Sequence, residues 1–199
     1  MGGTLLLVAA SMVWGVVHSL LASHAAKNLS IRWLGQANND RFYRFGYNVF
    51  SVLSFLPILA LLVLLPDRPL YNLPAPWLYL ALLGQGLAVV ALVVGVLQTG
   101  VWEFVGLSQL LRAGQPNSAR LTTSGLYRYV RHPLYTAGLV FIWLTPAMTV
   151  NRLALWLILS LYLVIGAMFE ERKLLREFGQ QYADYKAQTP MLIPWPFGR

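Results

Sequence analysis

The sequence predicts an all-α fold, a polytopic membrane bundle of about five spans whose last two form a short helical hairpin followed by a cytoplasmic C-terminal helix. Two observations predict it. Hydrophobic residues make up 57% of the 199 residues and charged residues only 11%, whereas roughly a quarter of an ordinary soluble domain is charged. Five uncharged apolar segments also match or approach the ~20 residues that a transmembrane helix needs: 4–22, 47–65, 76–98, 134–150 and 153–169.

The first and last of these segments need separate arguments. A cleaved signal peptide would explain residues 4–22, but signals carry a basic leading region and residues 1–22 have no charge. We therefore expect this segment to stay in the mature protein. Only Asn151 and Arg152 separate the last two segments, which predicts a tight hairpin. Both of its helices are short, so the sequence leaves open whether the hairpin fully crosses the bilayer.

The basic residues predict an orientation. All of the 15 Lys and Arg residues except Arg68 and Arg152 follow the first, third or fifth apolar segment. Because cytoplasmic loops carry an excess of Lys and Arg, we expect an integral protein of a bacterial inner membrane with its N-terminus outside and its C-terminus in the cytoplasm. The net charge of +8 then reflects topology and contact with anionic membrane lipids. No basic face lies outside the loops, so no nucleic-acid partner is expected.

The chain shows no linker or repeat, so we expect a single domain over residues 1–199, with three N-terminal spans in 1–98 and the site in 99–199. Asn38, Asn39 and Asp40 predict the cap of an interfacial helix through Phe45. After the fifth segment, four large side chains recur at steps of four, four and three: Leu174, Phe178, Tyr182 and Tyr185. This spacing predicts an amphipathic helix whose apolar stripe is a packing seam, a pocket wall or both.

Cationic side chains gather before the fourth segment without acidic neighbours. No Asp or Glu lies between Glu103 and Glu170, so the arginines of this loop must find counter-charges in lipid, in a ligand or in the Glu170–Glu171 pair. Two interpretations stay open: structural ion pairs that close the hairpin, or a pocket for a small ligand of both charges. The His132–Pro133 step favours the pocket, because proline suits the first helical turn and leaves donors for an anion.

Other residue types restrict the chemistry further. The chain has no cysteine, which removes disulfides, thiolate nucleophiles and cysteine-based metal sites. No His, Asp and Glu cluster has ligand spacing, so no metal is expected. His18 and His24 are interpreted as interfacial, although His18 inside the first span is also a candidate group on the substrate side.

A three-part motif carries a family resemblance. It consists of GLYRYVRHPLYTAG at residues 125–138, the pair Glu170–Glu171, and LLREFGQQYADYKAQTPMLIP at 174–194. Together these stretches are similar to the isoprenylcysteine carboxyl methyltransferase superfamily, and within it to bacterial members of the methanethiol S-methyltransferase type. The resemblance covers roughly the last 80 residues, and the combined spacing is far more specific than one short motif.

The resemblance implies an integral membrane methyltransferase that uses S-adenosylmethionine on its cytoplasmic side. By position it implies nine cofactor contacts: Gln115, Arg120, Leu121, Tyr127, His132, Pro133, Leu134, Tyr135 and Glu170. One position departs from the pattern. Eukaryotic relatives place a substrate-contacting arginine shortly before the acids, where this chain has Gly166. This difference speaks against a prenylated-protein substrate and leaves methyl transfer intact.

The acceptor decides which groups act in catalysis. A small thiol is the first expectation and a lipophilic amine or carboxylate the second, which gives S-methylation or carboxyl methylation. A thiol must lose its proton, helped by a nearby cation such as Arg131, while Glu171 is the alternative base. Two functions of other classes remain: a membrane reductase of related fold with a nicotinamide cofactor, and a non-catalytic membrane scaffold. The sequence does not reveal the oligomeric state.

Overall fold

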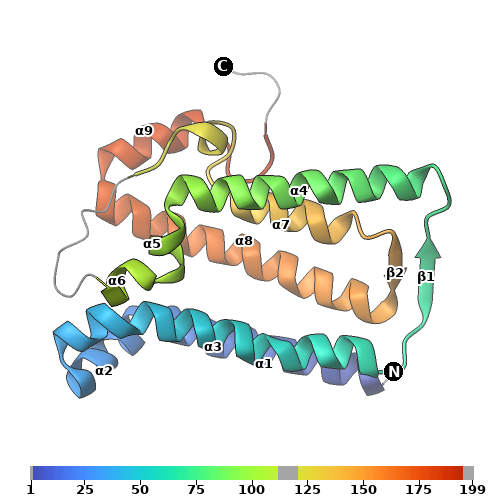
Figure 1. Cartoon of the computed structure of the whole chain (residues 1–199), viewed down its shortest axis with the longest axis horizontal. Coiled ribbons are helices and arrows are strands. Elements are labelled where there is room, and N and C mark those ends of the chain that lie inside the picture. The colour runs from blue at the N-terminus through green and yellow to red at the C-terminus, as the bar shows by residue number, and fades with distance from the viewer. Residues whose placement is uncertain (1, 112–120, 195–199) are drawn as a thin grey trace. The chain divides into compact units, whose positions relative to one another are not determined.

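Helices dominate the computed structural model of the chain, which describes residues 2–111 and 121–194 (Figure 1). Four helices are long and apolar enough to span a membrane: α1 (Gly2–Ala22), α3 (Gln36–Leu64), α4 (Trp77–Thr99) and α8 (Val150–Phe178). The shorter helices are α2 (His24–Leu34), α5 (Val101–Val105), α6 (Leu107–Leu111), the 3-10 turn η1 (Gly125–Arg128), α7 (Pro133–Trp143) and α9 (Gln180–Gln188). Strands β1 (Pro69–Asn72) and β2 (Ala147–Thr149) form a two-stranded sheet, a small exception to the predicted all-α fold.

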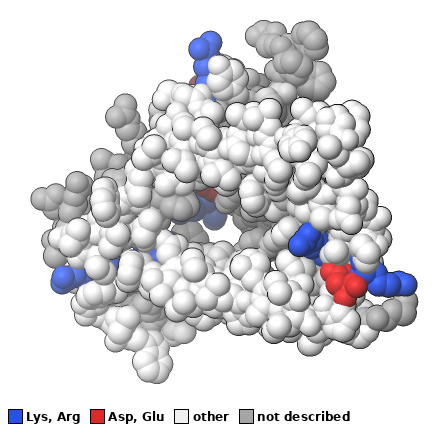
Figure 2. Space-filling view, turned by 45° about the vertical axis from the view of Figure 1, so that its right-hand side comes forward, with Lys and Arg blue, Asp and Glu red and all other residues white. Residues whose placement is uncertain are grey.

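Apolar side chains cover the outside of the four long helices. Within their most apolar stretches, only 6% to 17% of the residues are buried. Large side chains such as Val63, Leu83 and Leu161 are 80%, 61% and 62% exposed. In Figure 2 most of the visible surface is uncharged, with the acidic and basic groups gathered in a few places. Apolar surface on this scale is typical of membrane proteins, and together with the four long apolar helices it supports the predicted membrane class.

The hairpin that we predicted at residues 134–169 differs from the structure. Helix α7 has 11 residues, about 16 Å at 1.5 Å per residue, so α7 alone is too short for a hydrocarbon core of about 30 Å. Asn151 and Arg152 lie in the first turn of α8, not in a turn between helices. The reason is tertiary, because the buried Asn151 side chain accepts a hydrogen bond from Thr4 Oγ1 at 2.7 Å.

The predicted interfacial helix at Asn38 is also wrong as a separate element. Helix α3 begins at Gln36 and continues without a break to Leu64. The break comes earlier, at Gly35, whose φ of 79° ends α2 in a conformation that glycine adopts easily. The polar residues at 38–40 therefore extend the span instead of starting a new helix.

The chain divides into two compact units, and each is described by itself. The first unit contains residues 1–68, 100–118 and 149–158, and the second contains 69–99, 119–148 and 159–199. Helix α4, which we grouped with the N-terminal spans, therefore clusters with the C-terminal part. That all 199 residues act as a single domain stays a prediction.

In the first unit, α1 and α3 run antiparallel and are joined through α2. Their contacts pair the start of α1 with the end of α3, since a Cβ on Gly3 would lie 3.5 Å from Leu65. Further along, the Trp14 indole donates to Ser54 Oγ at 3.0 Å, and Tyr43 donates its hydroxyl hydrogen to Leu21 O. These bonds fix the register of the two helices and close the α1–α2 turn against α3.

In the second unit, α4 positions α7 (Figure 1). The two helices run antiparallel and approach closely at two glycines of α4. A Cβ on Gly95 would lie 2.7 Å from the Leu134 side chain, and a Cβ on Gly84 would lie 2.4 Å from the Leu144 side chain. Small residues at such crossings allow close packing of membrane helices. The Gln85 side chain donates to Phe141 O at 2.9 Å. Helix α4 thereby sets the place of the α7 N-terminus, where the candidate site begins.

Candidate functional site

The start of α7 is tied to the C-terminal segment of the chain. Pro133 occupies the first turn of α7, where its missing N–H costs nothing. The backbone N–H groups of Arg131 and His132 donate to Pro190 O at 2.9 Å and Met191 O at 3.1 Å, and Thr136 Oγ1 donates to Leu192 O at 2.7 Å. The first and last parts of the sequence motif therefore touch each other, which explains their joint occurrence.

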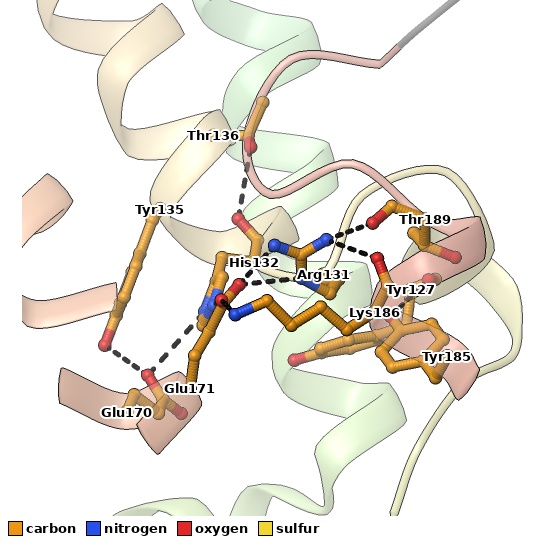
Figure 3. A network of polar contacts seen from close by, with 10 residues as sticks. All are labelled: Tyr127, Arg131, His132, Tyr135, Thr136, Glu170, Glu171, Tyr185, Lys186 and Thr189. Carbon is orange, nitrogen blue, oxygen red and sulfur yellow. Dashed lines mark hydrogen bonds and ion pairs between the residues drawn. The ribbon is translucent and has the colours of Figure 1, made fainter. Parts of the chain in front are cut away.

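An ion-pair cluster lies beside this contact (Figure 3). Arg131 Nη2 is 2.6 Å from Glu171 Oε1, and both side chains are nearly buried, at 9% and 6% exposed. Lys186 Nζ is 2.7 Å from Glu171 Oε2. The Arg131 guanidinium also donates to the backbone carbonyls of Lys186, at 3.1 Å, and Thr189. Each oxygen of Glu171 thus meets a cation, and the cluster joins the loop before α7 to α8 and α9.

The neighbouring acid, Glu170, has a different environment. Its side chain is 45% exposed, and it accepts a hydrogen bond from the Tyr135 hydroxyl at 2.8 Å. The Tyr135 ring stacks on His132 with centroids 5.3 Å apart and an angle of 6° between planes. Adjacent positions on a helix point about 100° apart, so Glu171 enters the ion-pair cluster while Glu170 faces an accessible surface with two rings beside it.

The His132 imidazole is buried, and burial favours its neutral form. Burial lowers its pKa below the ordinary value of 6.5, and the positive charge of Arg131 acts in the same direction, while Glu170 and Glu171 oppose the shift. The imidazole lies 3.7 Å from Glu170 Oε2 through Nδ1 and 3.5 Å from Glu171 Oε1 through Nε2. Both distances are long for hydrogen bonds. Its contacts with the acids are therefore not salt bridges near neutral pH.

Two buried polar atoms in this region make no hydrogen bond of ordinary geometry to the described residues: His132 Nε2, which lies 3.5 Å from Glu171, and the Tyr182 hydroxyl oxygen, which has Arg131 as a charged neighbour. The two residues are only 6% and 1% exposed. Buried polar groups in native proteins are almost always paired, so two orphans beside the exposed Glu170 indicate a place where a ligand supplies partners.

Tyrosines line the same region as neutral donors. Burial, together with the negative charge of Glu170, raises the pKa of Tyr127 to about 12. Burial also raises the pKa values of Tyr182 and Tyr185 to about 12. Tyr185 donates its hydroxyl hydrogen to Tyr127 O at 2.5 Å. These phenols stay protonated throughout the physiological range, so they can hold a ligand but cannot serve as bases near pH 7.

A tight turn delivers Tyr127 and Arg131 to the site. Gly125 begins η1 with φ +64°, and a Cβ at this position would lie 1.9 Å from the Gln98 side chain. Gln98 Oε1 accepts the backbone N–H of Leu126 at 3.1 Å. The end of α4 therefore fixes the turn, and glycine adopts the positive φ of its first residue with the least strain.

The structure brings together part of the predicted cofactor set. Tyr127, His132, Tyr135 and Glu170 lie in one region, and Pro133 starts the helix that carries it. Leu134 instead packs its side chain toward Gly95 of α4, so only its backbone can face the site. Gln115 and Arg120 lie outside the described residues, and nothing in the structure links Leu121 to the cluster.

Several residues of the site were not predicted from the sequence. Lys186, Thr189 and Thr136 hold the ion-pair cluster and the C-terminal segment, and Gln98 holds the η1 turn. A signal existed for Lys186, which follows Tyr182 by four residues and so shares a helix face with it. Gln98 had no signal, because its partner is a backbone amide 28 residues away.

Fold and site together define a class: a polytopic helical membrane protein with a buried ion-pair cluster next to a partly exposed acid and two orphaned polar atoms. The profile of the family described as Protein of unknown function (DUF1295) matches residues 4–189. The chain belongs to this family. No solved structure matches it.

Curated relatives confirm the predicted superfamily. The chain is 34% identical over 152 residues to a Methanethiol S-methyltransferase of a Pseudomonas species, and the matched region covers 72% of this chain and 58% of that protein. It is 31% identical over 191 residues to Methanethiol S-methyltransferase 1 of Bradyrhizobium diazoefficiens, covering 92% and 64%. Protein-S-isoprenylcysteine O-methyltransferase B of Arabidopsis thaliana is 26% identical over 91 residues, covering 44% and 46%. The chain thus spans less than two thirds of the first two relatives' length.

Proposed function

We propose that the protein is an S-adenosylmethionine-dependent membrane methyltransferase. The observation that carries the proposal is the environment of His132, whose buried Nε2 makes no hydrogen bond of ordinary geometry to the described residues and which stacks on Tyr135 beside the exposed Glu170. Relatives whose names state methyl transfer support the same function.

The residues present fit the chemistry of this cofactor. S-adenosylmethionine has an ammonium, a carboxylate, a sulfonium and an adenine ring. The exposed carboxylate of Glu170 would hold a cationic group, the Tyr127 and Tyr135 rings would face the sulfonium or the adenine, and His132 Nε2 and the Tyr182 hydroxyl would gain hydrogen-bond partners. A cation for the ligand's carboxylate falls to Arg120, which lies outside the described residues.

The reaction then needs alignment and a deprotonated acceptor. When bound, the cofactor supplies a sulfonium-bound methyl group that a thiolate can take in a direct displacement. Arg131, adjacent to His132, would favour the thiolate through its positive charge. Glu171 would accept the thiol proton only by loosening its bonds to Arg131 and Lys186. Alignment of the reacting atoms can supply about 7–11 kcal/mol of the barrier reduction.

A small thiol remains our first acceptor, and a lipophilic amine or carboxylate the second. Gly166 favours the thiol, because a glycine provides no cation at this position for a substrate carboxylate. Incubation with methyl-labelled cofactor and a panel of thiol, amine and carboxylate acceptors, followed by mass spectrometry, identifies the acceptor.

Calorimetry of the protein in detergent tests the site directly. We expect saturable binding of S-adenosylmethionine and of its demethylated product, abolished in His132→Ala and in Glu170→Ala. His24→Ala and Glu177→Ala are matched controls, because they remove the same side chains at exposed positions. Binding that is unchanged in both site variants refutes the assignment. Binding of NADPH in place of S-adenosylmethionine favours the reductase, and binding of neither favours the scaffold.

We further propose that the N-terminus lies outside and the C-terminus in the cytoplasm of a bacterial inner membrane. The absence of cysteine makes this easy to test with single introduced cysteines. A membrane-impermeant maleimide should label cysteine at Arg68 in intact spheroplasts and cysteine at Lys173 only after lysis. The reverse pattern means the opposite orientation.

A further inference from the structure

A pocket of about 440 Å³ lies in the first unit, at one end of α1, α3 and α8. Its lining comes from the start of α1, from the residues that follow α3 and from the first residue of α8: Thr4, Leu5, Pro66, Asp67, Arg68 and Val150. The volume is within the usual range for small-ligand pockets, about 300–1,000 Å³. Because each of the three helices is long and apolar enough to span a membrane, the pocket lies at the level of lipid headgroups.

Two opposite charges line this pocket. Asp67 and Arg68 are both exposed. The Arg68 guanidinium makes no hydrogen bond or ion pair with the described residues, and Asp67 forms no ion pair with a described cation. Arg152 acts on Asp67 as a nearby charge, beyond ion-pair distance. The pocket therefore offers one negative and one positive group to a ligand.

The Asp67 carboxylate is held in place from its buried side. Its Oδ1 accepts the backbone N–H of Arg68 at 2.8 Å and that of Asn151 at 3.0 Å. Burial alone would raise the pKa of this carboxyl. The two backbone bonds, a third bond from Thr149 and the positive charge of Arg152 outweigh burial and lower the pKa below the ordinary value of 3.8. Asp67 is thus a fixed negative charge near neutral pH.

Apolar surface adjoins the two charges. Leu5, which lines the pocket, is 68% exposed, and Leu64 at the end of α3 is 78% exposed. Exposed apolar patches mark sites of contact with lipid or with a partner. A ligand of this pocket therefore needs both charges in its head and an apolar part beside them.

We propose that the pocket binds one zwitterionic phospholipid that has a primary amine, with its ammonium at Asp67, its phosphate at Arg68 and an acyl chain beside Leu5. Phosphatidylethanolamine has this chemistry, because its ammonium can donate hydrogen bonds to the carboxylate. The quaternary ammonium of phosphatidylcholine has no N–H to donate, and an anionic lipid would place a like charge near Asp67. The exposed Leu5 favours a lipid over a soluble zwitterion. The proposal depends neither on methyl transfer nor on the orientation in the membrane.

Native mass spectrometry of the full chain in detergent tests the proposal by titration with three dioleoyl lipids: phosphatidylethanolamine, phosphatidylcholine and phosphatidylglycerol. They share their acyl chains and differ in headgroup. We expect one phosphatidylethanolamine to bind about tenfold more tightly than either of the others, the ratio that one charge-assisted hydrogen bond provides. Binding of phosphatidylcholine or phosphatidylglycerol that is as tight overturns the proposal. Soluble phosphoethanolamine should not displace the lipid, and displacement would overturn the assignment to a lipid.

Asp67→Asn tests the ammonium end of the pocket. Asparagine keeps a side-chain oxygen for the backbone N–H groups and removes the charge, so the preference for phosphatidylethanolamine over phosphatidylcholine should disappear. Asp40→Asn is the matched control, because this exposed carboxylate accepts bonds from the Gln36 amide outside the pocket. A preference that survives in Asp67→Asn overturns the assignment, as does an equal loss in Asp40→Asn.

Arg68→Gln tests the phosphate end and decides the matter if Asp67→Asn does not fold. Phosphatidylethanolamine and phosphatidylcholine both carry a phosphate, so the variant should weaken the binding of both lipids by a similar factor. Arg32→Gln is the matched control, because Arg32 is exposed on α2 and does not line the pocket. Unchanged affinities in Arg68→Gln, or the same loss in Arg32→Gln, would contradict the placement of the phosphate.

Discussion

Two polar clusters, one in each unit, differ in how completely their groups are satisfied. In the first unit Asn151 is fully buried, and its side chain accepts from Thr4 at 2.7 Å and donates to Pro66 O at 3.3 Å. Its backbone N–H donates to Asp67 Oδ1 at 3.0 Å. In the second unit the cluster around Arg131 and Glu171 is charged, and it leaves orphaned polar atoms and an exposed acid beside it.

This difference separates a structural cluster from a candidate site. Buried groups that satisfy one another contribute to stability and leave nothing for a ligand. A charged cluster with unsatisfied neighbours is costly in the free protein and gains from a ligand that completes it. We therefore expect changes at Asn151 to affect stability alone, and changes around Arg131 to affect both stability and binding.

The largest expected effect comes from Arg131→Met. It leaves the buried Glu171 with one cation, so the free energy of unfolding should fall by roughly 3–5 kcal/mol and cofactor binding should be lost. The double variant with Glu171→Leu should recover most of the stability, because two apolar residues replace a buried ion pair. Thermal unfolding and calorimetry in detergent measure both quantities. If the double variant also binds the cofactor normally, the ion pair is purely structural.

Asn151→Leu should have the next largest effect. It removes the part-buried hydrogen bonds of the Asn151 side chain to Thr4 and Pro66 and should cost about 2 kcal/mol, at roughly 1 kcal/mol for each bond. Cofactor affinity should match that of the wild type, since the described hydrogen-bond partners of Asn151 belong to the first unit. Reduced affinity in the folded variant would mean that the Asn151 cluster also affects binding, and that it is not purely structural.

Gly125→Ala tests how the η1 turn supports the site. The positive φ disfavours alanine by about 1–2 kcal/mol, and the new Cβ displaces the Gln98 side chain that holds Leu126. We expect a modest fall in melting temperature and a clear loss of cofactor affinity, because Tyr127 and Arg131 follow the turn. Gly138→Ala is the control at a helical glycine with open space around it. Equal melting temperatures and equal cofactor affinities in the two variants would show that Gly125 does not position the site.

The smallest expected effect is a pH dependence at His132. Because burial lowers its pKa in the folded protein, the unfolded chain binds a proton first as the pH falls below 6.5. The stability that the neutral imidazole contributes is therefore present above pH 6.5 and is lost as pH falls through the folded pKa. Unfolding measured between pH 7.5 and 5 should show a weaker slope in His132→Phe. An unchanged slope would argue against a neutral buried imidazole.

Individual residues show how far sequence reasoning reached. The motif led to His132, Tyr135 and Glu170, which the structure brings together. The predicted stripe led to Tyr182, which is 1% exposed, but the single helix expected for it is wrong, because Gly179, at φ 54°, separates α8 from α9. Sequence could not distinguish Glu170 from Glu171, because adjacent acids differ only in the direction that the helix gives them. Gln98 escaped because its partner, the backbone amide of Leu126, lies 28 residues away along the chain.

The sequence by itself determined the membrane class and the residue types of the site. The apolar character of long segments is a local property that composition and spacing record directly. Only the tertiary structure decided where helices begin and end, and which charges meet. Asn151 became part of a helix because Thr4 and Pro66 satisfy its side chain, and Glu171 became buried because two cations surround it. Such choices depend on contacts between distant residues, and no local pattern contains them.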